Sequence, residues 1–296
     1  MDTKNRIVQG GWLRRLAYGA VALAAVGLTA GLGTAQAATP GTSGAVTPSI
    51  IGGHPADQNY SFIVSLQVEK NGDPDHNRCG GTLVSPNWVL TAAHCVTDVT
   101  TDGTPFAVQD PAQFHVRVGS DDRTTGGTVS LLTGIVVNPG YVASDTRASG
   151  SDLALLHLAT RVSQRPVKLP VSEAAPGTKV RELGWGYTVD ADPTTVTTFL
   201  QQLDTKLLPT DTPKCVTAAN GDDSWGIRPG DDCADNVAGT YGPCNGDSGS
   251  PIVRLVDGAW VLVGADSRGP EEVCGAGPDI ITSASHFRGW ITQVIG

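Results

Sequence analysis

The chain has 296 residues, among them 37 glycines, 19 prolines and only 5 phenylalanines, and its formal net charge is −9. Its many turn-forming residues and weak helical periodicity favour an all-β globular protein. From Ile50 onward it has 16 basic and 28 acidic residues, a net charge of −12, which argues against binding to nucleic acid or to an anionic membrane.

The N-terminus has the features of a secretory signal peptide. Basic residues precede an apolar run from Leu16 to about Leu32, and Ala35-Gln36-Ala37 follows as a small-residue cleavage site. This pattern predicts a signal peptide over residues 1–37 and a secreted, extracellular protein without a membrane attachment in its mature form. A membrane anchor is the alternative, but the run is rich in Ala and Gly and ends at the cleavage site.

Residues 38–49 are too small and polar to fold alone, so they form a linker or a short pro-segment. From Ile50 the sequence changes to short alternating segments typical of β-strands, with turn signals such as Asn71-Gly72 between them. The expected strands are 62–68, 81–85, 88–91, 114–118 and 129–137, then 178–183, 200–208, 251–255, 260–265 and 279–282. We therefore expect two β-barrels or sandwiches, at about 50–165 and 178–296. A terminal helix follows, with Phe287, Trp290, Ile291 and Val294 on one face.

Three polar residues stand in small or apolar surroundings. Ser248 lies in Cys244-Asn245-Gly246-Asp247-Ser248-Gly249-Ser250-Pro251, a tight turn that exposes a hydroxyl and gathers backbone N–H groups. His94 ends an apolar strand, and Asp152 opens a buried one. Singly, they also fit a glycine-rich turn, a hydrogen-bonded core histidine and a cap. Together, in the order His, Asp, Ser, they indicate acyl transfer.

Further motifs stand in the same order at fitting intervals. They are Ile50-Ile51-Gly52-Gly53, Cys79-Gly80-Gly81-Thr82-Leu83, Thr91–Cys95, Asp152–Leu156, Gly184-Trp185-Gly186 and Gly246–Pro251. On these residues the chain resembles the trypsin/chymotrypsin family of serine peptidases, of the secreted, bacterial type, over essentially all of Ile50–Gly296. The resemblance implies a serine endopeptidase built from two antiparallel Greek-key β-barrels, with the active site in the cleft between them and no cofactor.

The resemblance also implies a role for each site residue. Ser248 attacks the scissile carbonyl, His94 transfers the proton, and Asp152 fixes the imidazole tautomer. The backbone N–H groups of Gly246 and Ser248 form the oxyanion hole. Ser267 supports the aspartate and leads the strand along which substrate lies.

Activation in this family uses a new N-terminus beside the aspartate that precedes the nucleophile. Here that pair is Ile50 and Asp247, so we expect cleavage of Ser49–Ile50 to switch the enzyme on. The alternative is that residues 38–49 remain as an inert tail.

The six cysteines are even in number and lie in the exported portion, which predicts three disulfides with fifteen conceivable pairings. The family pattern implies Cys79–Cys95, Cys215–Cys233 and Cys244–Cys274. No paired CxxC spacing supports zinc, so no metal is expected. Calcium at Ser120-Asp121-Asp122 is less favoured than a solvated turn.

The specificity pocket departs from the trypsin pattern. Its floor is Gly242 rather than an aspartate, whereas Asp279 stands where a pocket-lining glycine is usual. Some crustacean collagenolytic relatives have a similar exchange, and their pockets accept basic and apolar side chains. Ser267 and Gly269 are further expected substrate-binding residues. We expect the pocket to accept both apolar and basic side chains at P1, the residue before the cleaved bond. The alternative is that Asp279 turns outward or caps a turn.

Other departures lie close by. Arg268 replaces a usual aromatic, and we expect it to pair with Glu271, Glu272 or an acidic substrate residue. Asp266 replaces an apolar pocket residue, and Ser250 replaces a glycine with little expected effect on activity.

Expected partners are protein or peptide substrates and protein inhibitors, and we expect a monomer. The rival function is a catalytically silent homologue that serves as a binding module, although no triad residue is lost. An esterase on another fold is disfavoured, because it would need a Gly-x-Ser-x-Gly elbow with the histidine last.

Overall fold

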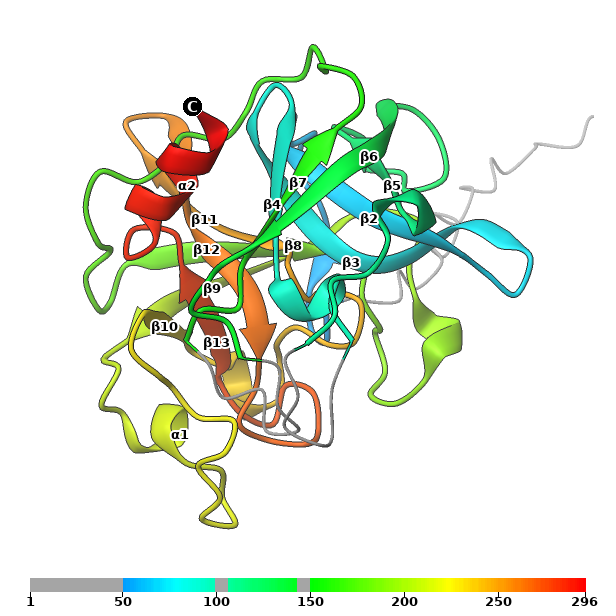
Figure 1. The fold of residues 1–296 in the computed structure, drawn as a ribbon. Coiled ribbons are helices and arrows are strands. Elements are labelled where there is room, and N and C mark those ends of the chain that lie inside the picture. Colours follow the sequence, from blue (N-terminus) through cyan, green and yellow to red (C-terminus); the bar gives the residue numbers. More distant parts are fainter. Residues whose placement is uncertain (1–49, 99–105, 143–149) are drawn as a thin grey trace, which may run out of the picture. The chain divides into compact units, whose positions relative to one another are not determined.

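The computed structural model describes residues 50–98, 106–142 and 150–296 (Figure 1). Contacts divide the chain into residues 1–44 and 45–296, and every described residue belongs to the second unit. The expected signal peptide and pro-segment, residues 1–49, lie outside the described residues.

A closed antiparallel barrel forms from the first six long strands, in the order β2-β3-β4-β7-β6-β5. Asn71 and Gly72 have positive φ and turn β2 into β3 as the sequence predicts. The barrel interior is filled by alternating apolar side chains such as Leu66, Val116 and Leu156. The strands are β2 (Ile63–Lys70), β3 (Asp73–Ser85), β4 (Trp88–Thr91), β5 (His115–Val118), β6 (Thr128–Val137) and β7 (Ala154–Leu158).

A second sheet has the order β1-β9-β10-β13-β12-β11-β8, and pairing of β8 with β9 closes six of its strands into a second barrel. The short β1 pairs with β9 at the edge. The strands are β1 (His54–Pro55), β8 (Lys179–Gly184), β9 (Gln201–Leu208), β10 (Asp231–Ala234), β11 (Pro251–Val256), β12 (Ala259–Arg268) and β13 (Asp279–Ser283).

Helices are short apart from the C-terminal one. α2 (Arg288–Ile295) buries Ile291, while Trp290 and Val294 pack against the main core from the same helix. The others are α1 (Pro213–Val216) and the 3₁₀ turns η1 (Ala93–Cys95), η2 (Pro111–Gln113), η3 (Pro193–Thr195) and η4 (Val237–Gly239). Within the described residues, no helix has both the length and the apolar character needed to span a membrane.

These elements confirm the all-β prediction of two antiparallel barrels and a C-terminal helix. The sequence did not predict β10, because Asp231-Asp232-Cys233-Ala234 has no apolar alternation. Its position comes from tertiary pairing with β13 and β9.

Candidate active site

Asp152 lies two residues before β7, is almost fully buried, and accepts three hydrogen bonds. Its Oδ1 accepts the backbone N–H of His94 at 2.9 Å. Its Oδ2 lies 2.7 Å from His94 Nδ1 and accepts the Ser267 hydroxyl at 2.7 Å. Burial alone raises the pKa of Asp152, but His94 and Ser267 outweigh it and the net effect lowers the pKa. An ionised Asp152 therefore holds the imidazole with its proton on Nδ1 and leaves Nε2 free.

His94 lies beside this carboxylate because the two residues flank neighbouring strands that pair with each other. β4 and β7 are antiparallel neighbours, with Thr91 opposite Ala154, so the end of β4 meets the start of β7. His94 then follows in η1, between the buried residues Ala93 and Cys95.

Ser248 lies in the loop before β11 and is held against the first barrel. The Gly80 N–H donates to the Ser248 carbonyl at 2.8 Å. Gly249 has φ +77°, and a Cβ there would lie 2.2 Å from Thr91 Oγ1, so both the backbone and the close approach require glycine. Among the described residues, His94 is hydrogen-bonded to Asp152 and not to Ser248. Such bonds often tighten only when substrate binds.

Two backbone N–H groups in the loop that carries Ser248 have no acceptor among the described residues. Gly246 has φ +98°, and its carbonyl accepts Asn77 Nδ2 at 2.9 Å. Tyr187 N–H donates to the Asn245 carbonyl at 2.9 Å. Within the described part of the chain, no acceptor takes the N–H of Gly246 or of Ser248. These two donors are therefore available to a developing oxyanion.

Asp247 is buried and bound through backbone groups. Its carboxylate accepts Gly186 N–H at 2.7 Å and Cys244 N–H at 3.0 Å. Burial nevertheless raises the pKa of Asp247 to about 7, against these two hydrogen bonds. Ile50 is fully buried, and Ile51 exchanges two 3.0 Å backbone hydrogen bonds with Gly242. The residues expected at the new N-terminus thus lie against the segment that leads to Asp247.

The cysteines pair as the family pattern implies, as Cys79–Cys95, Cys215–Cys233 and Cys244–Cys274. The first ties η1 to β3 beside His94. The third joins the nucleophile loop to the segment before β13. Both therefore brace the site.

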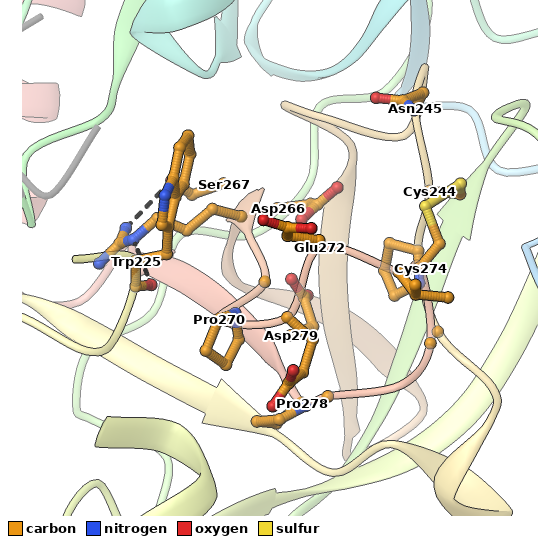
Figure 2. Close-up of a pocket in the computed structure, with 18 of the residues that line it drawn as sticks. Trp225, Cys244, Asn245, Asp266, Ser267, Pro270, Glu272, Cys274, Pro278 and Asp279 are labelled. Atoms are coloured by element: carbon orange, nitrogen blue, oxygen red, sulfur yellow. Dashed lines mark hydrogen bonds between the residues drawn. A yellow bond between two sulfur atoms is a disulfide. The ribbon is translucent and has the colours of Figure 1, made fainter. Parts of the chain in front are cut away.

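Ser248 is one of the residues that line a cavity of about 420 Å³. Figure 2 shows the wall of this cavity in close-up. Gly242, Ser267, Gly269 and Asp279 all contribute to its wall, as the sequence predicts. Asp279 does not turn outward, because it is 7% exposed and lines this cavity. The other lining residues are Trp225, Pro243, Cys244, Asn245, Asp266, Arg268, Pro270, Glu271, Glu272, Val273, Cys274, Gly275, Gly277 and Pro278.

The inner end of this cavity is unusually acidic. Asp266 and Asp279 line it together, and Glu182 and Asp247 lie close enough to act on them electrostatically. Burial is the largest cause that raises the pKa of Glu182, Asp266 and Asp279 well above their ordinary values, and their mutual repulsion adds to it.

The family model for trypsin matches residues 50–291. The chain belongs to the trypsin family. A trypsin of Phaedon cochleariae is 31% identical over 283 residues, covering 92% of this chain and 96% of the relative. A CLIP domain-containing serine protease B4 of Anopheles gambiae is 27% identical, covering 84% of this chain and 71% of the relative. Among solved structures, human heparin binding protein superposes with a TM-score of 0.63 at 25% identity, covering 83% of this chain and 96% of that one.

The chain is accordingly a serine-type endopeptidase of the trypsin family, with proteins as its substrate class. Its Arg268, however, does not pair with Glu271 or Glu272 as expected from the sequence. It is 6% exposed and forms an ion pair with Asp231, with Nη2 2.5 Å from Oδ2. It also donates to the carbonyl of Trp225 at 3.0 Å and to Ser267 Oγ at 3.2 Å. These partners hold the guanidinium in the wall of the cavity.

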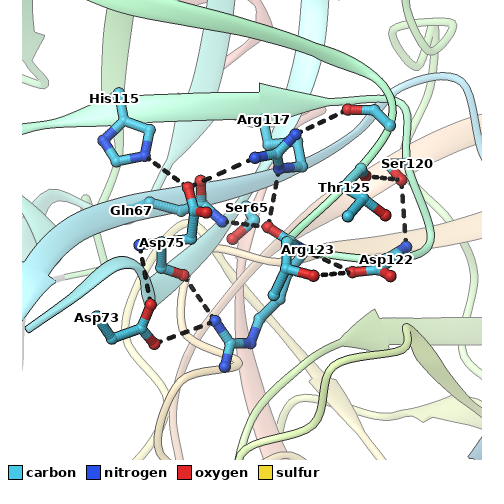
Figure 3. A network of polar contacts seen from close by, with 12 residues as sticks. Ser65, Gln67, Asp73, Asp75, His115, Arg117, Ser120, Asp122, Arg123 and Thr125 are labelled. Carbon is cyan, nitrogen blue, oxygen red and sulfur yellow. Dashed lines mark hydrogen bonds and ion pairs between the residues drawn. The ribbon is translucent and has the colours of Figure 1, made fainter.

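The loop at Ser120–Asp122 in this trypsin-family chain is a turn, but it is not simply solvated. Ser120 is buried, and its hydroxyl donates to the Thr125 carbonyl at 2.7 Å. Arg123 extends from the loop and donates to the carbonyl of Asp75 (Figure 3). It also donates to the carbonyl of Thr197. The Asp75 carboxylate in turn faces Arg117 and His115. Hydrogen-bond donors and cationic side chains of the protein thus contact the oxygen atoms around this loop.

Sequence reasoning missed three residues of the site in this peptidase. Glu182 lies on the same inward face of β8 as Val180, because residues two apart in a strand point to the same side. This alternation was the signal available in the sequence. Asp231 and Trp225 approach Arg268 from 37 and 43 residues away, and no local pattern marks either of them.

Proposed function

We propose that this peptidase is secreted and cleaves peptide bonds through an acyl-enzyme, with His94, Asp152 and Ser248 as its catalytic triad. One observation carries the proposal. A buried, ionised Asp152 accepts both the backbone N–H and the Nδ1 proton of His94, with Ser267 on its remaining side. This arrangement leaves imidazole Nε2 free to accept the proton of Ser248.

The chemistry follows from these positions. His94 Nε2 takes the proton of Ser248 as the hydroxyl adds to the scissile carbonyl. The resulting imidazolium is stabilised by Asp152 and then protonates the leaving amine. Water attacks the acyl-enzyme with His94 again as base, which restores Ser248. The open N–H groups of Gly246 and Ser248 hold the oxyanion in both halves, and losing one such donor in related chemistry costs about 10²–10³ in kcat.

An active-site-directed organophosphonate tests the triad. The processed wild type becomes labelled at Ser248, whereas Ser248→Ala does not. A correctly processed wild type that resists labelling would favour the silent binding module instead.

The name of the human structural relative says that it binds heparin. The net charge of −12 from Ile50 onward argues against polyanion binding by this chain.

Activation by cleavage of Ser49–Ile50 is the second part of the proposal. Asp247 is buried, carries two backbone hydrogen bonds, and has a pKa raised to about 7, so an added ammonium would stabilise its ionised form. Residues 1–37 serve as the signal peptide and residues 38–49 as the pro-segment. N-terminal sequencing of the active protein should begin at Ile50. A fully active protein that begins at Ala38 would contradict this activation.

The P1 preference is the third part. Asp279 supplies a carboxyl on the cavity wall, with an Oδ2 atom that has no hydrogen-bond partner in the described residues. In a cavity whose floor is Gly242, this carboxyl supports cleavage after basic as well as apolar residues. Profiling with a peptide library should show loss of basic-residue cleavage in Asp279→Gly, with apolar cleavage kept. We expect the enzyme to act as a monomer and to be open to protein inhibitors.

A further inference from the structure

We propose that Asp266 and Asp279 share a proton at the inner end of the cavity, so that the ambient pH decides whether the peptidase prefers a cationic or an uncharged P1 side chain. This inference rests on the proposed role of Asp279 as the carboxyl that meets P1. It adds a second carboxyl and a regulation of the same pocket.

The geometry begins with two side chains on neighbouring strands. Asp266 lies near the end of β12 and Asp279 begins β13, and both line the 420 Å³ cavity. Figure 2 shows the two side chains in the same part of the pocket, between Trp225 and the Cys244–Cys274 disulfide. Each carboxyl group is close enough to act on the other electrostatically, and with a proton on one of them that group can donate a hydrogen bond to its neighbour.

One oxygen of this pair is left for a ligand. Asp279 Oδ2 is buried and has no partner among the described residues. A buried carboxyl oxygen without a donor is costly unless something else satisfies it. Here a ligand that enters the open cavity can supply that donor.

The groups around the pair do not neutralise it. Glu182 on β8 and Asp247 in the nucleophile loop add negative charge, and Glu182 Oε2 is also unpartnered in the described structure. Arg268 on β12 favours the ionised form of Asp279, but it is already paired with Asp231. His94 favours the ionised form of Asp266. The other charged residues that line the cavity are Glu271 and Glu272.

Two adjacent buried carboxyls cannot both ionise without a counter-charge, so they titrate as a coupled pair. With one proton shared, the pocket offers one negative charge and binds a cationic P1 side chain. With both protonated, it offers only neutral hydrogen-bonding groups and prefers an uncharged P1 side chain. A P1 arginine that enters also favours loss of the shared proton, because binding and ionisation are linked.

The test compares two substrates on one enzyme. Peptides that differ only in arginine or citrulline at P1 are nearly isosteric, and arginine stays charged throughout. We expect the ratio of kcat/KM for arginine over citrulline to rise with pH, by up to about tenfold per pH unit within the transition. The catalytic groups act on both substrates, so effects on the chemical step cancel in this ratio.

Two matched variants locate the effect. Asp266→Asn donates a fixed hydrogen bond to Asp279, so the ratio should stay high and become nearly independent of pH. Glu182→Gln removes a repulsive charge, so the transition should move to lower pH. A ratio whose pH profile is the same in wild type and Asp266→Asn would overturn the shared proton.

Failure of the underlying proposal gives a different result. If Asp279→Asn keeps the arginine preference of the wild type, Asp279 is not the pocket charge and both proposals fall. If Asp279→Asn loses that preference while the wild-type ratio is flat with pH, only the proton sharing falls.

A measurement on the wild type alone covers the case in which a variant does not fold. Benzamidine is an aromatic amidinium of P1 size, and its binding should release a fraction of a proton at about pH 8, where an ordinary imidazole is neutral. Calorimetry in two buffers of different ionisation enthalpy measures this release. Binding without proton release would contradict the pair, and no binding at all would contradict both proposals.

Discussion

At the scale of single residues, the site depends on side chains whose roles are fixed by few contacts. Asp152 has all three of its hydrogen bonds committed to His94 and Ser267, which supports its proposed role in orienting the imidazole. The motifs predicted these residues directly, because each stands in a short, distinctive sequence. They did not predict how Arg268 would point, since its partner Asp231 is distant in sequence.

Asp152→Asn tests the orienting role. The amide keeps the acceptor for the His94 backbone N–H, but it favours the wrong imidazole tautomer. We expect kcat at neutral pH to fall by about 10⁴. The melting temperature should change little, since the shape and the buried contacts are kept. Steady-state kinetics and thermal unfolding of the processed enzyme measure both, and a loss of less than tenfold in kcat would contradict the assignment.

At the scale of elements, the last three residues of β12, which are Asp266, Ser267 and Arg268, have three different roles. Its register with β13 shifts between Asp266 and Arg268, which marks a β-bulge. Bulges reorient side chains at functional sites, and this one lets adjacent residues serve the cavity, the triad and the ion pair. The periodicity of the sequence predicts β12 itself, but a bulge depends on pairing with another strand and has no local signature.

The Arg268–Asp231 ion pair is the contact to test at this scale. Removing one partner leaves the other charge buried, so Arg268→Met should lower the free energy of unfolding by about 3–5 kcal/mol. Asp231→Leu should do the same. The double variant should recover most of the loss, because no uncompensated charge remains. Urea unfolding of the four proteins in a Ser248→Ala background avoids self-digestion, and additive losses would show that the two side chains are not coupled.

At the scale of the whole molecule, the proposed activation would couple the new chain terminus to the stability of the fold. The pKa of Asp247 is raised to about 7 from 3.8. A carboxyl with a raised folded pKa stabilises the fold fully below its unfolded pKa and loses that contribution as the pH rises through the folded value. Cleavage at Ser49–Ile50 would supply an ammonium that reverses this loss.

The uncut chain should therefore lose stability between about pH 4 and pH 7 relative to the cut chain, by up to about 4 kcal/mol. Glu182, Asp266 and Asp279 are present in both forms, and the Asp247→Asn variant separates their contribution from that of Asp247. Chemical unfolding of both forms across this range measures the difference, again with Ser248→Ala. Asp247→Asn should abolish it, and an equal pH dependence in the two wild-type forms would refute the pairing of Ile50 with Asp247.

The pairing of Ile51 with Gly242 has a consequence for the protease that performs this cut. Ile50 is buried and Ile51 is already hydrogen-bonded to the pocket floor, so the leaving side of the scissile bond is not free to enter another active site. The two hydrogen bonds must open first, and the rate of activation then depends on the free energy of that local opening. A small molecule that fills the pocket and steadies its floor would accordingly slow conversion of the precursor, although it never touches the activating protease.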